Sequence, residues 1–389
     1  MSLGGEALAC VMGGMDLVRP LGLAGVRCAV VAPPGSPTAY SRFTRAIIPE
    51  PVGQDEEELV DALLRFAVAQ PVRPVLYYEE DGQLLLISRH RERLSAAFRF
   101  VIADAELVGT LVDKARFRDL AERLGLPVPR TRRLHPAAGS APPDLDLRFP
   151  LVIKPLARGA SWFRIEPAGK AIQVDGREEL RALWPRLVAE GIELLAQELI
   201  PGPETRIESY HVYVDGSGGI AGEFTGRKIR TYPQAFGHST ALTITDARDV
   251  ADLGRALVRR LDLRGVAKFD FKRAPDGTLH LLEVNPRFNL WHHLGAIAGV
   301  NLPALVYADM VGRPRPPTTA ARVGTNWCRL AGDLSAARAG GVPLGAWLLW
   351  VMRCEAKQAV AWDDPMPVLG AALSRLTARR HTAGAWMLP

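Results

Sequence analysis

The sequence predicts an α/β and α+β protein with a doubly wound N-terminal sheet, a two-lobed central region and a helical C-terminal region. Apolar runs alternate with amphipathic helical patterns over residues 1–106, which favours a parallel sheet. An Asp-Gly turn joins two strand patterns near residue 276, and a Pro-rich link at 313–317 precedes further helical patterns. We expect units at 1–106, 107–312 and 313–389, with central lobes at about 107–196 and 197–312.

The N-terminal elements follow from apolar periodicity. ALACVMGG, VRCAVVAPP and PVLYYEED read as strands, and residues 15–25 and 55–69 have the period of helices. The Gly13-Gly14 pair lacks the G-x-G-x-x-G pattern of a phosphate loop, so we favour a tight turn. Residues 79–81, Glu-Glu-Asp, follow a strand at the end where open sheets bind ligands. We favour solvation of these carboxylates over contact with a substrate amine.

Composition and charge narrow the function classes. The 48% hydrophobic and 23% charged content is typical of a globular protein, and four cysteines without a C-x-x-C pair indicate a reduced, cytoplasmic protein. There is no signal-peptide pattern, and the longest apolar stretch, GVPLGAWLLWVM, is too short for a bilayer. The net charge of +6 includes no basic run, so we expect no nucleic acid or membrane partner.

Lysine is rare, with seven residues among the 48 that are Lys or Arg. Lysine positions are therefore candidates for sites that need a compact point charge. Lys114 begins an amphipathic helix that ends at Gly125, with an ordinary helix lysine as the alternative. Lys154 ends an apolar strand pattern just before a proline, and a lysine there needs an anionic partner or an exit to solvent.

The segment 266–288, VAKFDFKRAPDGTLHLLEVNPRF, reads as two strands joined by the Asp276-Gly277 turn. Asp-Gly accepts the positive φ angles of a tight two-residue hairpin. With that turn, Asp270 lies opposite Glu283, and Lys268 lies opposite Asn285. Two carboxylates that face each other repel, so this pair requires a cation between them.

The same hairpin predicts a metal site. Side chains alternate along a strand, so Asp270, Glu283 and Asn285 share one face. This all-oxygen set suits Mg²⁺, with Mn²⁺ as an alternative, together with substrate phosphates. Arg287 is the next residue on that face, where it would meet phosphoryl or acyl-phosphate oxygens. A surface hairpin with solvated carboxylates is the alternative interpretation.

The string E-x-N-x-R at residues 283–287, closing a hairpin whose first strand carries Asp270, resembles the metal-binding core of the ATP-grasp superfamily. Its nucleotide site is similar to those of carbamoyl-phosphate synthetase and biotin carboxylase. The C-terminal helical patterns, including a last helix at 368–380, resemble the carboxylate-amine ligase branch, which includes D-aspartate ligase. The resemblance implies a pre-ATP-grasp domain followed by an ATP-grasp fold.

The resemblance also implies a nucleotide site. Lys114 would reach the nucleotide phosphates, Lys154 would bind the α-phosphate, and the small-residue loop 157–162 would close over them. The backbone of segment 197–200 would read the adenine edge, its glutamate would face the adenine amino group, and Glu204 would accept from the ribose hydroxyls. The implied cofactor-binding residues are Lys114, Lys154, Gln197, Glu198, Leu199, Ile200 and Glu204.

Three clustered cations follow on the next strand pattern. Alternation puts Lys228 and Arg230 on one face and Arg227 on the other. We favour Lys228 and Arg230, together with Arg287, as the catalytic cations that meet the triphosphate or the acyl phosphate.

The implied activity is that of an ADP-forming ligase. ATP would phosphorylate a carboxylate of an amino acid or peptide, and an amine would attack the acyl phosphate to give an amide or peptide bond. This chemistry needs charge neutralisation and positioning. An enzyme that uses bicarbonate or another non-amine acceptor and a non-catalytic ATP-binding module are the alternatives. The expected partners are small-molecule carboxylates and amines, with a homodimer as an open question.

Overall fold

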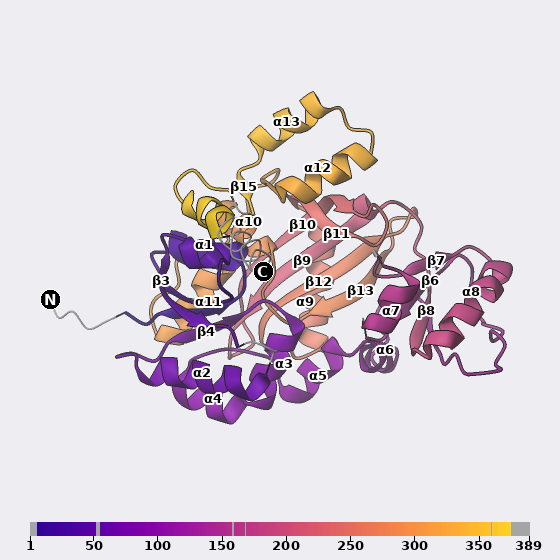
Figure 1. Cartoon of the computed structure of the whole chain (residues 1–389), viewed down its shortest axis with the longest axis horizontal. Helices are drawn as coiled ribbons and strands as arrows, with labels where there is room; N and C mark the ends of the chain where they lie inside the picture. Colours follow the sequence, from indigo (N-terminus) through magenta and orange to yellow (C-terminus); the bar gives the residue numbers. More distant parts are fainter. Residues whose placement is uncertain (1–5, 52–54, 158, 168, 359, 375–389) are drawn as a thin grey trace, which may run out of the picture.

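The computed structural model describes the chain except for residues 1–5, 52–54, 158, 168, 359 and 375–389. Its strands form three sheets, two of four strands and one of seven. Figure 1 shows the N-terminal sheet at one end of the molecule, the seven-stranded sheet in the centre and the second four-stranded sheet at the other end. The predicted combination of α/β and α+β architecture is confirmed.

The N-terminal sheet is parallel, as predicted, with the order β3-β2-β1-β4. Every residue of β1 and β4 is buried, because helices cover both faces of a parallel sheet. The strands are β1 (Ala9–Met12), β2 (Cys28–Ala32), β3 (Thr44–Pro49) and β4 (Val75–Tyr78). The helices are α1 (Met15–Leu23), α2 (Glu56–Val68), α3 (Asp81–Arg89) and α4 (Arg91–Ala97), followed by α5 (Ala105–Val112) and α6 (Lys114–Arg123).

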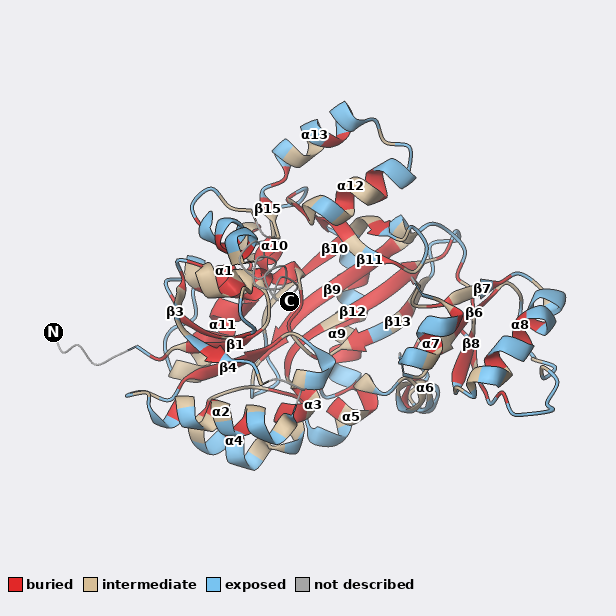
Figure 2. Ribbon diagram, viewed as in Figure 1, coloured by how far each residue is buried: buried red, intermediate tan, exposed pale blue. Residues whose placement is uncertain are grey.

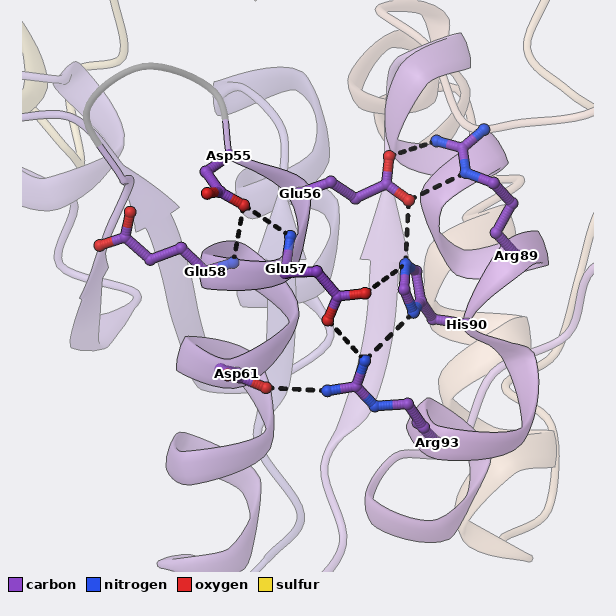
Figure 3. A network of polar contacts seen from close by, with 8 residues as sticks. All are labelled: Asp55, Glu56, Glu57, Glu58, Asp61, Arg89, His90 and Arg93. Carbon is purple, nitrogen blue, oxygen red and sulfur yellow. Dashed lines mark hydrogen bonds and ion pairs between the residues drawn. The ribbon is translucent and has the colours of Figure 1, made fainter.

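A network of charged side chains joins α2 to α3 and α4 (Figure 3). Arg93 donates to Glu57 at 2.7 Å and to Asp61 at 2.8 Å, and His90 Nε2 lies 2.9 Å from Glu56 Oε1. Most of these side chains are exposed, and exposed ion pairs contribute only about 0.2–1 kcal/mol each. The network therefore fixes how these surface helices lie beside each other and adds little to global stability.

The second four-stranded sheet is antiparallel and has a hydrophobic core of its own. Its order is β5-β8-β6-β7, and its core includes Trp162, Trp184 and Leu187. We call this part of the chain, residues 131–198, the small lobe. Its strands are β5 (Thr131–Leu134), β6 (Leu151–Pro155), β7 (Ile172–Val174) and β8 (Leu194–Glu198), and its helices are α7 (Ala160–Ile165) and α8 (Arg177–Glu190).

The seven-stranded sheet has the order β13-β12-β9-β10-β11-β14-β15. Figure 2 shows that its central strands are largely buried, and their core is continuous with that of the N-terminal sheet. Tyr77 of the N-terminal sheet packs against Phe288, which follows the last strand of the hairpin, and their ring centroids are 5.1 Å apart. The long strands are β9 (Ile207–Val214), β10 (Ile220–Tyr232), β11 (His238–Thr245), β12 (Gly265–Arg273) and β13 (Leu279–Asn285), and the helices are α9 (Arg248–Arg260), α10 (Trp291–Ile297) and α11 (Leu302–Val311).

The β12–β13 hairpin has the predicted pairs. Asp270 pairs with Glu283, and Lys268 pairs with Asn285. β12 is also paired with β9 along its length, so both of its edges are fixed. The backbone that carries the predicted metal ligands is therefore held rigidly in the sheet.

The turn of this hairpin differs from the prediction. Ala274 N donates to Thr278 O at 2.8 Å, so residues 275–277 form a three-residue loop, and Gly277 has φ of 91°. Proline at the first central position and glycine at the last favour a type I turn, which explains the longer loop. A register shift that leaves Leu282 without a partner restores the predicted pairing beyond it.

The C-terminal region is helical, as predicted, but it also adds two strands to the sheet. β14 (Asn326–Cys328) pairs antiparallel with β11, and β15 (Ala356–Lys357) pairs parallel with β14. The helices α12 (Leu330–Ala339) and α13 (Leu344–Arg353) lie beyond β10 and β11 in Figure 1. Residues 366–374 are helical, and the rest of the helix predicted at 368–380 lies outside the described residues.

Within the described part of the chain, no single helix has both the length and the apolarity to cross a bilayer. The helices α10 and α11 reach both only when counted together, across a bend of 88°. Most residues of both helices are buried inside the protein.

Candidate nucleotide and metal site

One face of the seven-stranded sheet carries the charged residues of the β12–β13 hairpin. Lys268, Asp270 and Lys272 alternate along β12 and therefore share a face. Directly opposite residues of antiparallel strands also share a face, which adds Glu283 and Asn285 from β13. The two phenylalanines between these polar residues are fully buried in the core, which fixes the orientation of the strand.

Asp270 is bonded through both of its oxygens. Ser209 Oγ, from β9, donates to Asp270 Oδ1 at 2.5 Å, and Lys268 Nζ donates to Oδ2 at 2.6 Å. Lys268 Nζ also lies 3.8 Å from Glu283 Oε1. Burial alone would raise the pKa of Asp270, but the charges of Lys268 and Lys228 outweigh it and hold that pKa below its usual range. In this structure a lysine supplies the cation that the facing carboxylates require.

The three predicted metal ligands lie close together. Asn285 Nδ2 donates to Glu283 Oε1 at 3.0 Å, and Lys268 links Glu283 to Asp270. Their side chains carry the hard oxygen atoms that Mg²⁺ or Mn²⁺ prefers. In this structure the Asn285 nitrogen faces Glu283, and the Asn285 oxygen accepts from Arg287.

Arg287 connects the β12–β13 hairpin to the N-terminal region. Its Nη2 donates to Asn285 Oδ1 at 3.3 Å, so it lies beside the predicted ligands. Its Nε donates to Asp81 Oδ1 at 2.5 Å, and its Nη1 donates to Glu79 O at 3.0 Å. Asp81 is thus ion-paired rather than simply solvated. The side chain of Glu79 accepts from Gly14 N at 2.6 Å, and burial raises the pKa of Glu79.

Two predicted nucleotide-binding lysines lie at the end of β6. Lys154 Nζ donates to Gln197 Oε1 at 2.8 Å, across the β6–β8 pair. Lys114 Nζ donates to Pro155 O at 2.6 Å and to Leu156 O at 3.0 Å. The structure therefore brings Lys114, Lys154 and Gln197 to one end of the small lobe.

The small lobe and the seven-stranded sheet bring their charges together. Burial lowers the pKa of Lys154. The negative charges of Glu283 and Glu204 raise this pKa, and the positive charges of Lys228 and Lys272 lower it further. These four charges all belong to the segment 204–283, whereas Lys154 belongs to the small lobe. Together with Asp270, on which Lys228 also acts, these residues form what we call the charged group: Lys154, Glu204, Lys228, Asp270, Lys272 and Glu283.

The predicted adenine-reading segment has other partners. Glu198 Oε1 accepts from Arg148 N at 3.0 Å, and Glu198 N donates to Arg130 O at 2.9 Å. Leu199 N donates to Pro150 O at 3.0 Å. These contacts hold Glu198 and Leu199 against residues 130, 148 and 150, whereas the neighbouring Gln197 accepts from Lys154. Glu204 is different, because Lys272 Nζ donates to its Oε1 at 3.5 Å.

The expectation that Lys228 and Arg230 share a face fails. Register shifts on both sides of Arg230 break the alternation of β10. The positive charge of Lys228 lowers the pKa of both Asp270 and Lys154, as described above. Arg230 instead donates to Asp333 of α12 at 2.8 and 2.7 Å, and its guanidinium lies 4.1 Å from the centre of the Trp350 ring.

The prediction from sequence assigned no function to Ser209, Lys268 or Lys272. The pattern K-x-D-x-K on β12 places both lysines on the face of Asp270, so strand alternation could have found them. Ser209 and Asp333 carry no comparable signal, because their partners are 61 and 103 residues away in the chain.

Comparison with known proteins finds relatives in sequence and in fold. Residues 193–353 match a family model described as "ATP-grasp in the biosynthetic pathway with Ter operon". D-aspartate ligase of Enterococcus faecium is 27% identical over 308 residues, which cover 75% of this chain and 72% of that protein.

Two solved structures show the same fold. L-amino acid ligase from Bacillus licheniformis has a TM-score of 0.59 and 17% identity, covering 81% of this chain and 76% of that chain. N5-carboxyaminoimidazole ribonucleotide synthetase, solved as an ADP complex, has a TM-score of 0.60 and 18% identity, covering 82% and 81%.

The match over residues 193–353 identifies an ATP-grasp region in this chain, and the fold resembles that of the two solved structures. The chain is similar in sequence to D-aspartate ligase and similar in fold to the L-amino acid ligase. The resemblance found in the sequence is thereby confirmed.

Proposed function

We propose that the protein is an ADP-forming ligase that joins the carboxylate of an amino acid or peptide to an amine through an acyl phosphate. The observation that carries this proposal is the contact of Asp270, Glu283 and Asn285 with one another and with Lys268 on the hairpin, within electrostatic reach of Lys154 of the small lobe. Cations and carboxylates from two facing sheets form a site in which a metal–triphosphate complex can be neutralised on several sides.

In this proposal the acidic and amide side chains bind the metal, and the lysines bind the phosphates. Asp270, Glu283 and Asn285 hold Mg²⁺ or Mn²⁺, which would neutralise negative charge on the phosphates. Lys154 and Lys228 approach the same phosphates from opposite lobes. Lys114 and Gln197 position the end of β6 and the Lys154 ammonium, as their hydrogen bonds indicate.

The roles of the remaining predicted residues are also proposals. Glu204 faces the ribose, with Lys272 holding its carboxylate. Segment 197–200 contacts adenine after its end moves away from residues 130, 148 and 150. Arg287 positions Asn285 relative to the N-terminal domain. Arg230 holds α12 in place, because its charge is already paired with Asp333.

The domain boundaries near 106 and 312 are part of the proposal. The parallel sheet ends before residue 106, and the small lobe has its own core. The shared core of the first sheet and the seven-stranded sheet supports a substrate site built from both.

The amino acid substrate class rests on the relatives. D-aspartate ligase and L-amino acid ligase carry amino acids in their names. ADP release from Mg²⁺-ATP, measured with a panel of amino acids, tests the proposal. We expect release that depends on both a carboxylate and an amine, and a product of their combined mass less water by mass spectrometry. Bicarbonate-dependent release, or nucleotide binding without turnover, would contradict it.

A further inference from the structure

Lys268 occupies the position between the two facing carboxylates of the hairpin. Its Nζ lies 2.6 Å from Asp270 Oδ2 and 3.8 Å from Glu283 Oε1. The side chains of Lys268 and Asp270 are 15% and 4% exposed, so little water screens the pair. The ammonium group therefore stands where a divalent ion bound by both carboxylates would have to stand.

The bonds to Asp270 would place a bound metal ion close to the Lys268 ammonium. Ser209 occupies Oδ1, and Lys268 occupies Oδ2. A magnesium ion binds a carboxylate oxygen at roughly 2.0–2.1 Å. An ammonium group at 2.6 Å from the same oxygen would be repelled by the ion at close range.

The local structure allows the lysine, and not the strand, to move. β12 is paired with β9 on one side and β13 on the other, so its backbone is fixed. The four-carbon stem of lysine lets the ammonium shift by several ångströms without any backbone change. Glu283 is 57% exposed and can follow either cation.

We propose that Lys268 is a resident counter-ion of the metal site, which the divalent ion must displace. This inference rests on the proposed function, because it assumes that Asp270, Glu283 and Asn285 hold the metal. In the nucleotide-free protein Lys268 lies within ion-pair distance of both carboxylates and holds them together. It thereby weakens binding of the bare metal ion, and the phosphates of the arriving nucleotide favour the exchange by attracting the displaced ammonium.

The test is a Mn²⁺ titration of the nucleotide-free full chain, followed by electron paramagnetic resonance of the free ion. Lys268→Met should bind Mn²⁺ at least about fivefold more tightly than the original chain. Arg273→Met is the control, because it removes one positive charge from the same strand on the opposite face, where Arg273 pairs with Glu208 and Asp249. It should change the affinity less than twofold. Equal affinities for Lys268→Met and the original chain, or an equal gain in both variants, would overturn the inference.

Asp270→Asn separates this inference from the proposed function. It should abolish the Mn²⁺ site, and if it binds like the original chain, the metal site itself is misplaced and the inference falls with it. A second readout covers poor folding of Lys268→Met. Its melting temperature without metal should be lower than that of the original chain, and Mn²⁺ should raise it by more. An equal rise in both proteins would contradict displacement.

A nucleotide analogue supplies the third arm. With a non-hydrolysable ATP analogue, the gain in Mn²⁺ affinity should be larger in the original chain than in Lys268→Met, since only the former contains an ammonium to attract away. The same gain in both would count against the proposed exchange.

Discussion

Five of the seven lysines gather at the candidate site: Lys114, Lys154, Lys228, Lys268 and Lys272. Arginine supplies most of the remaining ion pairs, such as that between Arg93 and Asp61 on the surface. Lysine suits a site where phosphates and a metal exchange places, because its charge is compact and its stem flexible. The rarity of lysine in the sequence was thus a useful guide to individual residues.

Asp270 is the residue on which activity should depend most. Asp270→Asn removes a charge that the proposed metal site needs, and we expect ADP release to fall by at least about 100-fold. The measurement is steady-state ADP release at saturating Mg²⁺-ATP. Asp276→Asn, in the exposed turn of the same hairpin, is the control and should leave the rate within twofold. A comparable loss in both variants would show that the hairpin fold, and not the ligand, had been damaged.

His292 should make stability depend on pH. It is fully buried, neither ring nitrogen has a hydrogen-bond partner within the described part of the chain, and burial lowers its pKa to about 3. The unfolded chain takes up this proton near pH 6.5, whereas the folded chain does not. Stability is therefore lost as the pH falls from 6.5 towards 3, by about 2 kcal/mol at pH 5.

Urea unfolding at pH 7 and pH 5 checks this expectation. His292→Phe should reduce the loss of unfolding free energy between these two pH values by about 2 kcal/mol. His135→Gln, at an exposed position, should leave the loss unchanged. An identical pH dependence in His292→Phe and the original chain would show that the ring is protonated in the folded protein.

At the scale of elements, the hairpin shows what strand patterns predict and what they miss. The pairing of Asp270 with Glu283 was predicted from a two-residue turn that does not exist. The pairing is correct because the three-residue loop and the unpaired Leu282 cancel. Burial of alternate phenylalanines fixes which face of β12 is polar, and that constraint is readable from the sequence. Turn length and bulges depend on local details that the pattern does not contain.

The sequence was a poor guide where contacts are remote. Strict alternation put Lys228 and Arg230 together, but register shifts in β10 and a carboxylate 103 residues away separate them. The strands β14 and β15 have three and two residues, too few to show a period. Glu198 is correctly placed at the end of β8, yet its partners come from loops of the small lobe.

The attachment of α12 should depend on Asp333. This carboxylate is fully buried and accepts from Arg230, from Thr240 at 3.0 Å and from Trp347 at 2.9 Å. Asp333→Ala leaves the guanidinium and two other donors without a partner, and we expect a loss of about 3 kcal/mol in unfolding free energy. Chemical denaturation measures it. Asp363→Ala removes an exposed pair with Arg42 and should cost less than about 1 kcal/mol; similar losses would contradict the assigned role.

At the scale of the molecule, the residues of the candidate site come from two parts of the protein, each with its own hydrophobic core. One core runs from the N-terminal sheet through the seven-stranded sheet, and the small lobe has the other. A lobe with its own core can move as a unit against the larger body, as lids do in enzymes that enclose their substrates. The sharing of a core between the N-terminal sheet and the seven-stranded sheet was not predictable from composition and pattern, because it depends on contacts between residues far apart in the chain.

Closure of the small lobe should be visible in hydrogen exchange. With Mg²⁺ and a non-hydrolysable ATP analogue, amides of β6, β8 and the connection 199–206 should exchange several-fold more slowly. The helix α2, at the far end of the molecule (Figure 1), serves as the internal control and should not change. Slowing of equal size in both regions would indicate a general gain in stability and not closure.

The two short strands after the Pro-rich link have a consequence for the integrity of the sheet. β14 covers the outer edge of β11, and β15 covers β14. Without them, the unpaired main-chain amides and carbonyls of β11 would be open to any extended peptide, including the same strand of another molecule. The strands β14 and β15 therefore prevent self-association through the edge of β11. A shortened chain that ended at residue 325 would tend to form insoluble aggregates even if the residues of the candidate site were intact.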